Sequence, residues 1–406
     1  MNLDPPKETT STVPFLEDLL EDDPRRERRG SGALIPPSGQ AATQHHGDDH
    51  QVSKIGRLVL EDGSEFSGTL FGATRPVAGE VVFNTGMVGY PESLTDPSYA
   101  GQILVLTYPH IGNYGVPPWR RDDLGLPEWF ESERIQVSGL VISSLSSDVS
   151  HWSAERALDD WLKQEDVPGL FGVDTRAVAK RLRDSGAMLG KVLPSGVDIA
   201  WHDPNTSNLV AEVSVREPVS YGTDGPRVVL VDTGAKASIV RRLVRAGARV
   251  LRVPWDYDFF KESFDGLFLS NGPGDPKMAD RTIEHVRRAL EQRVPTFGIC
   301  LGNQILALAA GADTYKLKFG HRSQNQPCVE VGTQRCMVTS QNHGYAINVT
   351  TLPAGWREWF VNANDGTNEG ILHEWKPARG VQFHPEATPG PTDTSFLFER
   401  FLEMLL

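Results

Sequence analysis

Two short segments in the second half of the chain carry residue types that could perform nucleophilic catalysis. The first runs from Pro295 to Gln304 and consists of an apolar run, a Gly-x-Cys-x-Gly turn centred on Cys300, and a helix-forming run. The two glycines allow a tight strand-to-helix reversal that exposes a thiol, as in the nucleophile elbows built around serine. A helix N-terminus beside the thiol favours the thiolate, which is the attacking form. Cys300 is therefore the candidate nucleophile.

The second segment runs from Gly380 to Glu386 and ends in the sequence His384-Pro385-Glu386. Pro385 disfavours a helical conformation at His384, which predicts an extended chain there. Residues two apart in an extended chain point to the same side. Glu386 could therefore orient the His384 ring while His384 takes a proton from Cys300, which is the logic of a catalytic triad. Each segment alone is compatible with a structural role, but the two together favour a triad.

Length, charge and cysteine usage exclude several classes of function. The chain has 406 residues and a formal net charge of −13, and an acidic chain is a poor partner for nucleic acid. Its three cysteines have neither the spacing of a zinc site nor the even number of a closed disulfide set. No apolar run approaches the ~18 residues needed to span a membrane. We therefore expect no metal site, no membrane partner and a cytoplasmic location.

Composition divides the chain into four expected segments. They are a disordered N-terminal tail at 1–52, a first domain at 53–200, a linker at 201–225 and a second domain at 226–406. The tail is rich in Pro, Gly and charged residues, so it cannot bury enough apolar surface to offset its ordering entropy. Its histidines, His45, His46 and His50, have no cysteine or structured context that would suggest metal binding.

The periodicity of the two domains predicts an α/β fold. In the first domain, β-rich runs are followed by helical patterns at Trp152 to Gln164 and at Thr175 to Ser185, which predicts a smaller mixed α/β domain. In the second domain, apolar strands alternate with helices from Val228 to Ile299, which predicts a doubly wound, mostly parallel sheet. The site of such a sheet lies at the carboxyl ends of its strands, where Cys300 and His384 are expected.

Several motifs together resemble the class I, or triad, glutamine amidotransferases, and more narrowly the small subunit of carbamoyl-phosphate synthase. In the second domain they are Ser270-Asn271-Gly272-Pro273-Gly274-Asp275-Pro276, Gly298-Ile299-Cys300-Leu301-Gly302, Gln341-Asn342-His343-Gly344-Tyr345 and His384-Pro385-Glu386. In the first domain they are Gly79-Glu80-Val81-Val82-Phe83-Asn84-Thr85-Gly86-Met87 and Leu94-Thr95-Asp96-Pro97-Ser98-Tyr99. The first-domain motifs are specific, because other triad amidotransferases lack that domain.

The resemblance implies roles for named residues of this chain. Cys300 would form a glutamyl thioester, His384 would act as general base and acid, and Glu386 would orient His384. The backbone N–H groups of Gly272 and Leu301 would form the oxyanion hole. The residues that would hold the glutamine substrate are Ser98, Gly272, Gly274, Leu301, Gln304, Asn342, Gly344 and Tyr345.

The resemblance also implies a partner. The family's small subunit releases ammonia, which travels through an internal passage to a large subunit that uses bicarbonate and ATP to make carbamoyl phosphate. We therefore expect a heterodimer with that large subunit, no cofactor in this chain, and ATP and magnesium in the partner. Two alternatives stay open. The chain could feed a synthase of specialised metabolism, or it could be a catalytically idle regulatory paralogue.

Three features depart from the family pattern. Asn303 stands where the family often has histidine, and Ser323 to Gln326 replaces a glycine-rich stretch. The segment from Val116 to Arg134 is longer and more apolar than expected, and both a subunit interface and a locally packed loop would account for it.

Overall fold

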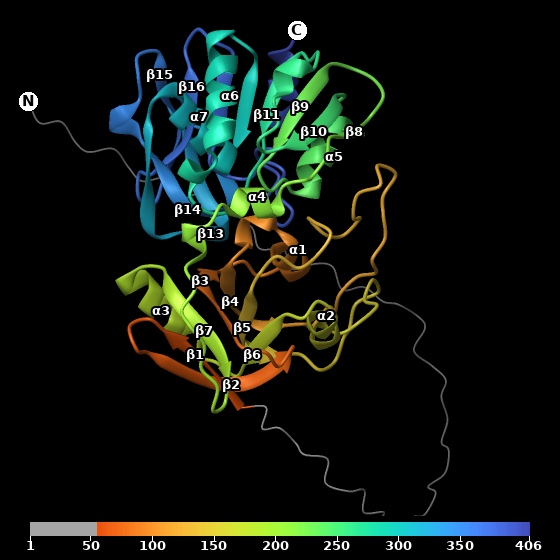
Figure 1. The fold of residues 1–406 in the computed structure, drawn as a ribbon, viewed down its shortest axis with the longest axis vertical. Coiled ribbons are helices and arrows are strands. Elements are labelled where there is room, and N and C mark those ends of the chain that lie inside the picture. Colours follow the sequence, from red (N-terminus) through yellow and green to blue (C-terminus); the bar gives the residue numbers. More distant parts are fainter. Residues whose placement is uncertain (1–54) are drawn as a thin grey trace, which may run out of the picture. The chain divides into compact units, whose positions relative to one another are not determined.

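The computed structural model describes residues 55–406, which belong to one compact unit. The expected disordered tail at residues 1–52, with its three histidines, lies outside the described residues. Within the described part, two sheets organise the chain: a closed barrel formed by the first seven strands and a ten-stranded sheet formed by the other ten. Both sheets are visible in Figure 1.

The barrel has the strand order β1-β2-β6-β5-β4-β3-β7. Its strands are β1 Ile55–Leu60, β2 Glu65–Gly72, β3 Val77–Asn84, β4 Gln102–Ile111, β5 Gly139–Leu145, β6 Pro168–Phe171 and β7 Met188–Pro194. Strands β3 to β6 pair in parallel along β3-β4-β5-β6, and the remaining pairs are antiparallel. Two helices pack on the barrel through Val178 of α3 (Thr175–Ser185) and Trp161 of α2 (Leu158–Gln164), each in a separate apolar cluster. The first domain is therefore mixed α/β, as predicted. The closure of its sheet into a barrel was not predicted from the sequence.

The second sheet has the order β14-β13-β15-β16-β17-β12-β11-β9-β10-β8. Its strands are β8 Val219–Tyr221, β9 Arg227–Asp232, β10 Arg249–Pro254, β11 Gly266–Leu269, β12 Thr296–Ile299, β13 Asp313–Glu330, β14 Cys336–Asn348, β15 Trp356–Asn362, β16 Asn368–His373 and β17 Ala378–Val381. The five strands β10, β9, β11, β12 and β17 are parallel, and the strands on both flanks are antiparallel. The parallel centre is the part that carries Cys300.

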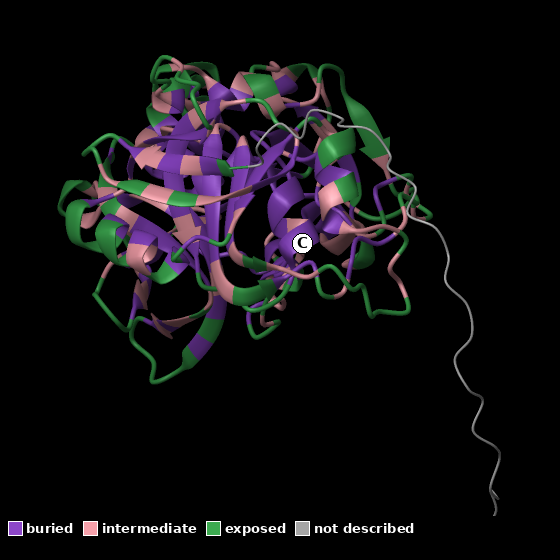
Figure 2. Cartoon of the chain, turned by 90° about the horizontal axis from the view of Figure 1, so that it is seen from below, coloured by how far each residue is buried: buried purple, intermediate pink, exposed green. Residues whose placement is uncertain are grey.

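Helices cover both faces of this parallel centre, which is the expected doubly wound arrangement. They are α5 Ala237–Arg245, α6 Asp280–Glu291, α7 Leu301–Ala310 and α8 Leu397–Glu403. Along β9, Val228 and Leu230 pack with α5 and α8, whereas Val229 and Val231 pack with α6 and α7. This period-two alternation buries the strand on both faces. Figure 2 shows the strands buried at the centre, with exposure confined to the periphery.

The connector between the two sheets is ordered. Residues 201–225 contain a short helix, α4 Leu209–Val213, and the strand β8, which pairs with β10 at the edge of the second sheet. A second short helix, α1 Tyr90–Thr95, and the 3₁₀ turn Pro97–Tyr99 lie between β3 and β4 and contain much of the Leu94 to Tyr99 motif. The connector therefore contributes to the fold of the second domain.

The segment from Val116 to Arg134 is packed against both parts of the described chain. Trp119 stacks on Phe130 with ring centroids 4.8 Å apart, and Arg241 of α5 donates to the carboxylate of Asp122 over 2.7 Å. The backbone N–H of Ala237 donates to the carbonyl of Glu131 over 2.9 Å. Of the two interpretations, the structure supports a packed loop.

One expected helix begins later than predicted. Residues from Trp152 onward were expected to be helical, but α2 begins at Leu158 and Trp152 is exposed. The Trp152 ring instead meets the ring of Trp129 edge-on, outside any helix. Its position in the sequence therefore gave an apolar residue to the helical pattern although it packs in a loop.

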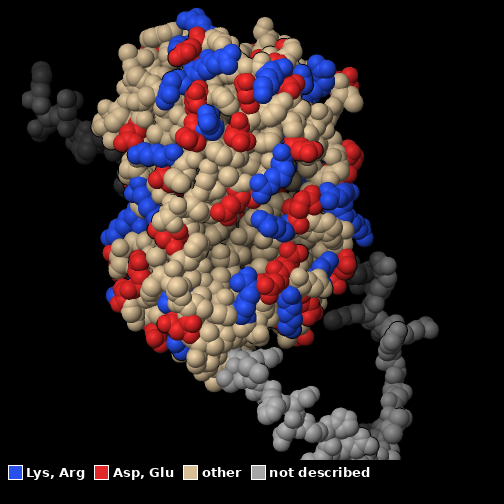
Figure 3. All heavy atoms as spheres, in the orientation of Figure 1, with Lys and Arg blue, Asp and Glu red and all other residues tan. Residues whose placement is uncertain are grey.

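Among the described residues, no helix is long and apolar enough to cross a membrane. On the face shown in Figure 3, lysine and arginine side chains alternate with aspartate and glutamate, without a basic stripe.

Candidate active site

Cys300 occupies the tight turn between β12 and α7. Its backbone has φ 53° and ψ −106°, a region that residues other than glycine rarely adopt. A Cβ added at Gly302 would lie 2.4 Å from the carbonyl oxygen of Leu269, and one at Gly298 would lie 2.5 Å from the backbone of Gly302. Both glycines are therefore required for the strand and the helix to approach this closely, which explains the Gly-x-Cys-x-Gly spacing.

His384 and Glu386 follow the adjacent parallel strand, β17, and are both buried. The backbone N–H of His384 donates to the carbonyl of Ser340, which fixes the segment against β14. Nδ1 of His384 lies 2.6 Å from Oε1 of Glu386. A proton on Nδ1 satisfies this contact and leaves the lone pair of Nε2 available to Cys300. The extended geometry predicted from Pro385 thus brings the imidazole and the carboxylate together.

Cys300, the third member of the group, lies close to the His384 ring but forms no hydrogen bond with it. Nε2 of His384 has no hydrogen-bond partner among the described residues, and the Cys300 thiol points to the carbonyl of Asn342 over 3.6 Å. The thiol is nevertheless near enough that its charge raises the pKa of His384. Catalytic contacts of this kind commonly tighten only when substrate is bound.

Lys236, which the sequence analysis missed, completes the group. Its buried Nζ lies 3.1 Å from Oε1 of Glu386 and donates to the carbonyl of Ala387 over 2.7 Å. Burial alone would lower the pKa of Lys236, but the carboxylates of Glu386 and Glu131 outweigh it and raise that pKa. Lys236 is therefore a permanent cation behind the triad.

The charges of this group set two strongly shifted pKa values. Burial alone would raise the pKa of Glu386, but the positive charges of Lys236 and His384 lower it to about 2. Burial alone would lower the pKa of His384, but the negative charges of Glu386 and Cys300 raise it to about 10. The arrangement thus stabilises the imidazolium form of His384 beside the candidate nucleophile Cys300.

All of the residues predicted to hold glutamine line one pocket together with Cys300. They are Ser98, Gly272, Gly274, Leu301, Gln304, Asn342, Gly344 and Tyr345. His384 and Glu386 do not line this pocket, and His384 faces a smaller cavity behind it. Cys300 therefore faces the pocket that contains the predicted glutamine-binding residues, whereas His384 faces the other cavity.

The barrel contributes Ser98 to this pocket through a network of side chains. Nδ2 of Asn271 donates to Oγ of Ser98 over 2.8 Å and is 3.3 Å from Oδ1 of Asp96. Nδ2 of Asn342 donates to the other oxygen of Asp96 over 3.2 Å. The Leu94 to Tyr99 motif is thus joined to two of the second-domain motifs at the pocket wall.

Gly272 and Leu301, whose backbone N–H groups are expected to form the oxyanion hole, are neighbours in the structure. Leu301 is the first residue of α7, so its N–H has no partner within the helix. A Cβ added at Gly272 would lie 2.7 Å from the Leu301 side chain and 2.0 Å from the carbonyl oxygen of Thr233. Only glycine allows the backbone at position 272 to approach the elbow this closely.

Charged residues that the sequence analysis did not assign also line the pocket. Nζ of Lys316 lies 2.6 Å from Oε1 of the buried Glu80, and Arg322 is buried beside them. Burial would raise the pKa of Glu80, but Lys316 and Arg322 outweigh it and lower that pKa. Charges of both signs at one wall suit a zwitterionic amino acid. Glu80 lies within the Gly79 to Met87 motif, so the sequence did contain a signal for this residue.

Comparison with known proteins agrees with this geometry. The family model described as glutamine amidotransferase class-I matches residues 229–404, and that of the carbamoyl-phosphate synthase small chain, CPSase domain, matches residues 58–192. The chain therefore contains a carbamoyl-phosphate synthase small-chain domain followed by a class-I glutamine amidotransferase domain. The two matched stretches contain the ten-stranded sheet's parallel centre and the barrel, respectively.

Relatives of this chain are much longer proteins. The chain is 52% identical to the multifunctional protein pyr-3 of Neurospora crassa, with 85% of the chain matching 21% of that protein. It is 54% identical to the multifunctional protein CAD of Squalus acanthias, with 85% matching 16%. It is 49% identical to the human mitochondrial carbamoyl-phosphate synthase [ammonia], with 87% matching 24%. The chain therefore spans about a fifth of the length of these relatives.

Two departures from the family pattern have clear positions in the structure. Asn303 is fully buried beside β17, where a Cβ added at Gly380 would lie 2.5 Å from its Oδ1. Its side-chain amide has no hydrogen-bond partner among the described residues. Gln324 donates through Nε2 to the carbonyl of Val88 over 2.7 Å, so it contacts the barrel. The backbone N–H of Asn303 donates to the carbonyl of Cys300 over 3.1 Å, but among the described residues neither the Asn303 nor the Gln324 side chain forms a hydrogen bond with Cys300 or His384.

Proposed function

We propose that this chain is the glutaminase component of a carbamoyl-phosphate synthase. It would hydrolyse L-glutamine through a Cys300 thioester and deliver the ammonia to a large, ATP-using component that makes carbamoyl phosphate from bicarbonate. The observation that carries the proposal is the pairing of Cys300, which lines the pocket, with the buried His384 and Glu386 next to it. The two domain matches alone do not decide it, because a comparably similar human relative is named for ammonia rather than glutamine.

In the proposed reaction, the Cys300 thiolate attacks the side-chain carbonyl carbon of glutamine and forms a tetrahedral oxyanion. The N–H groups of Gly272 and Leu301 stabilise that oxyanion. The imidazolium of His384 gives its proton to the leaving amine, and the carbon–nitrogen bond breaks to release ammonia and leave a thioester. His384 then takes a proton from water, whose oxygen attacks the thioester. Glutamate leaves, Cys300 is regenerated, and one water has been consumed for each ammonia released.

Two adjoining cavities support a route for ammonia away from the triad. One cavity is lined by His384 and by Asn84, Ser93 and Gln324. A second cavity shares those last three residues and reaches the exposed Met87 and Val88. A small neutral molecule released beside His384 could pass through both to the surface of the barrel. We propose that the large component covers this exit.

The relatives support the identity of that partner. Their names describe multifunctional proteins or carbamoyl-phosphate synthases, and this chain matches about a fifth of each. We propose a large synthetase component as the partner, in a heterodimer, with ATP and magnesium bound by that component. We also propose that this chain needs no cofactor of its own, because the thiolate, imidazolium and backbone donors supply every proton and charge in the reaction above.

The decisive experiment compares Cys300→Ser with wild type in the complex with its synthetase component. We expect glutamine-dependent carbamoyl phosphate synthesis to be lost and ammonia-dependent synthesis to persist, because serine lacks the easily ionised thiol. Cys336→Ser removes an exposed thiol and serves as the matched control. Full glutaminase turnover in Cys300→Ser would refute the nucleophile assignment, whereas a wild type without glutamine-dependent synthesis would favour the catalytically idle alternative.

Location and acceptor need separate measurements. We predict a cytoplasmic protein, although the human relative is named as mitochondrial. Fractionation of cells that express the natural protein tests this location. Assay of the purified complex for carbamoyl phosphate, rather than another carbamoylated product, separates the proposed acceptor from a synthase of specialised metabolism.

A further inference from the structure

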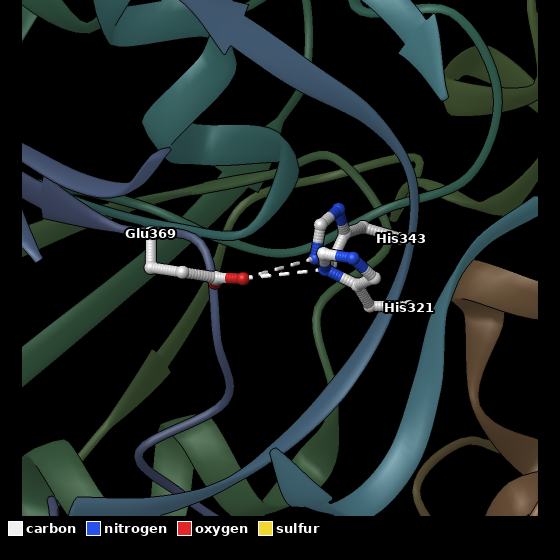
Figure 4. Close-up of side chains that lie close together, drawn as sticks. All are labelled: His321, His343 and Glu369. Carbon is white, nitrogen blue, oxygen red and sulfur yellow. Dashed lines mark hydrogen bonds and ion pairs between the residues drawn. The ribbon is translucent and has the colours of Figure 1, made fainter. Parts of the chain in front are cut away.

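A buried cluster of two histidines and a glutamate lies at the junction of three strands, apart from the triad. His321 of β13 and His343 of β14 are direct cross-strand partners, and Glu369 belongs to β16. A register shift precedes His321, and Gly320 has φ 69° with no room for a side chain. Such irregularities re-aim side chains. Figure 4 shows the Glu369 carboxylate pointing to both imidazole rings.

The outward nitrogen of each imidazole already has an acceptor. Nε2 of His321 lies 2.9 Å from the carboxylate of Asp365. Nδ1 of His343 lies 2.9 Å from the backbone carbonyl of Tyr345. Metal-bound histidines show this pattern, because a carboxylate or carbonyl on the far nitrogen fixes the ring and its tautomer. Both rings are therefore set with their other nitrogen as a lone-pair donor.

Those inward nitrogens converge on oxygen acceptors. Oε1 of Glu369 lies 3.3 Å from Nδ1 of His321 and 4.0 Å from Nε2 of His343. Oε1 of Gln341 lies 3.1 Å from the same nitrogen of His343. The ligand atoms of His321, His343 and Glu369 all lie within 4.8 Å of one another. Each of these contacts can be satisfied either by a proton on the imidazole or by a cation that both groups bind.

The carboxylate of Glu369 has few hydrogen-bond donors around it. Glu369 has no exposed surface, and its Oε2 has no hydrogen-bond partner among the described residues. Nδ2 of Asn362 donates to Oε1 over 3.0 Å. A buried carboxylate with an unpartnered oxygen next to two imidazole nitrogens is a site that a cation would stabilise.

We propose that His321, His343 and Glu369 bind a divalent transition-metal cation of the zinc class, with Gln341 supplying a fourth donor. Two imidazoles and a carboxylate are a donor set that Zn²⁺ uses. Bonds of roughly 2.0–2.2 Å require the three side chains to draw closer by rotamer adjustment. The cation would join β13, β14 and β16, so its role is structural.

The site would also stiffen one wall of the glutamine pocket. His343 lies between Asn342 and Gly344, which both line that pocket. The carbonyl of Tyr345 accepts from His343 and also from Nε2 of Gln304 over 2.8 Å. A cation on His343 would therefore hold the strand that presents these residues, without touching the thiol or the catalytic imidazole.

The experiment uses the full chain with Cys300→Ser, which removes the thiol most able to bind metal elsewhere. Zn²⁺ binding is measured by calorimetry, and Co²⁺ binding by its visible absorption. We expect one tight site, absorption typical of tetrahedral Co²⁺ and no thiolate-to-metal charge-transfer band. Thermal unfolding of each protein with and without Zn²⁺ reports whether the cation stabilises the folded state.

Three further substitutions make the test specific. Glu369→Gln removes a ligand but keeps the shape, and should weaken binding by more than about 100-fold. Asp365→Asn removes an outer partner, and should weaken it by roughly 10–100-fold. His285→Asn changes a half-buried histidine outside the cluster, and should leave binding unchanged.

Each outcome is decisive. Two results together support the site. Zn²⁺ affinity falls in the order given above, and Zn²⁺ raises the unfolding temperature of the Cys300→Ser protein but not of its Glu369→Gln derivative. No tight binding, or equal binding in the Glu369→Gln protein, overturns it. The cluster is then a hydrogen-bonded network in which a proton on His321 bridges Asp365 and Glu369. If Glu369→Gln does not fold, the Zn²⁺ affinities of Asp365→Asn and His285→Asn still distinguish a metal site from a hydrogen-bonded network.

Discussion

Replacement of Lys236 by methionine tests whether the buried charges around the triad stabilise one another. Lys236 is 3% exposed, and its charge faces Glu386 and Glu131, which are also buried. Methionine keeps most of the apolar stem, so the change removes a charge without opening a large cavity. Glu386 would keep only its contact with His384, and Glu131 would lose its nearest cation.

The expected loss is large because two carboxylates would be left without their shared cation. Breaking a buried ion pair from one side typically destabilises a protein by about 3–5 kcal/mol. An unfolding entropy of about 2.1 cal/mol/K per residue over roughly 350 residues converts this to a Tm lowered by about 4–7 °C. The turnover number for glutamine should fall as well, since Glu386 would hold His384 with one fewer support.

Chemical denaturation and a thermal scan measure the effect, with Lys191→Met as the matched control. Lys191 is also buried, but its partner Asp198 is mostly exposed and water can solvate it. That control should cost only about 1 kcal/mol. Glu131→Gln added to Lys236→Met should recover part of the loss. A stability of Lys236→Met equal to that of the control would refute the reasoning.

Four further predictions follow from the same geometry. Ser98→Ala should raise KM for glutamine by roughly 5–30-fold with little change in kcat, measured by steady-state hydrolysis, because one hydrogen bond to substrate is lost. His384→Asn should lower kcat more than Glu386→Gln by about 10–100-fold, and equal mild losses would mark the pair as structural. Since the pKa of His384 is raised to about 10, its stabilising contribution is complete below about pH 6.5 and is lost as pH rises through 10. The Tm of wild type should therefore fall between pH 7 and 10 more steeply than that of Glu386→Gln, and parallel curves would contradict the shift. Residues 226–406 expressed alone, once shown to fold by circular dichroism, should be a poor glutaminase, and unchanged KM and kcat would contradict a shared pocket.

Part of the candidate site could be predicted from the sequence, because its residues follow the carboxyl ends of predicted parallel strands. Cys300 and His384 follow adjacent parallel strands, and the carboxyl ends of such strands meet at one edge. Lys236 follows β9 at the same edge, so the same rule could have found it. Ser98 was named only through the family resemblance. No local pattern indicates that a residue of the barrel will face a particular strand of another sheet.

Other features depended on long-range pairing that composition does not reveal. The His321–His343 pair requires the register of β13 on β14, which shifts twice along its length. The closure of the barrel requires β1 to meet β7, which is more than 120 residues later. Glu131 reaches α5 from a loop whose length looked anomalous. A one-dimensional pattern specifies which face of a strand is apolar, but not which strand is its neighbour.

Two acidic residues of the first domain, Glu131 and Glu80, place negative charge beside lysines of the second domain. Glu131 precedes β5 and places its charge by Lys236, and its carboxylate accepts from the N–H and hydroxyl of Ser238 at the start of α5. Glu80 of β3 pairs with Lys316 at the pocket wall. In both places the barrel supplies an anion and the second domain supplies the cation. The charges around Cys300, His384 and Glu386 are therefore complete only when both domains are present. This would tie the proposed glutamine hydrolysis to the same domain whose surface is proposed to meet the synthetase component.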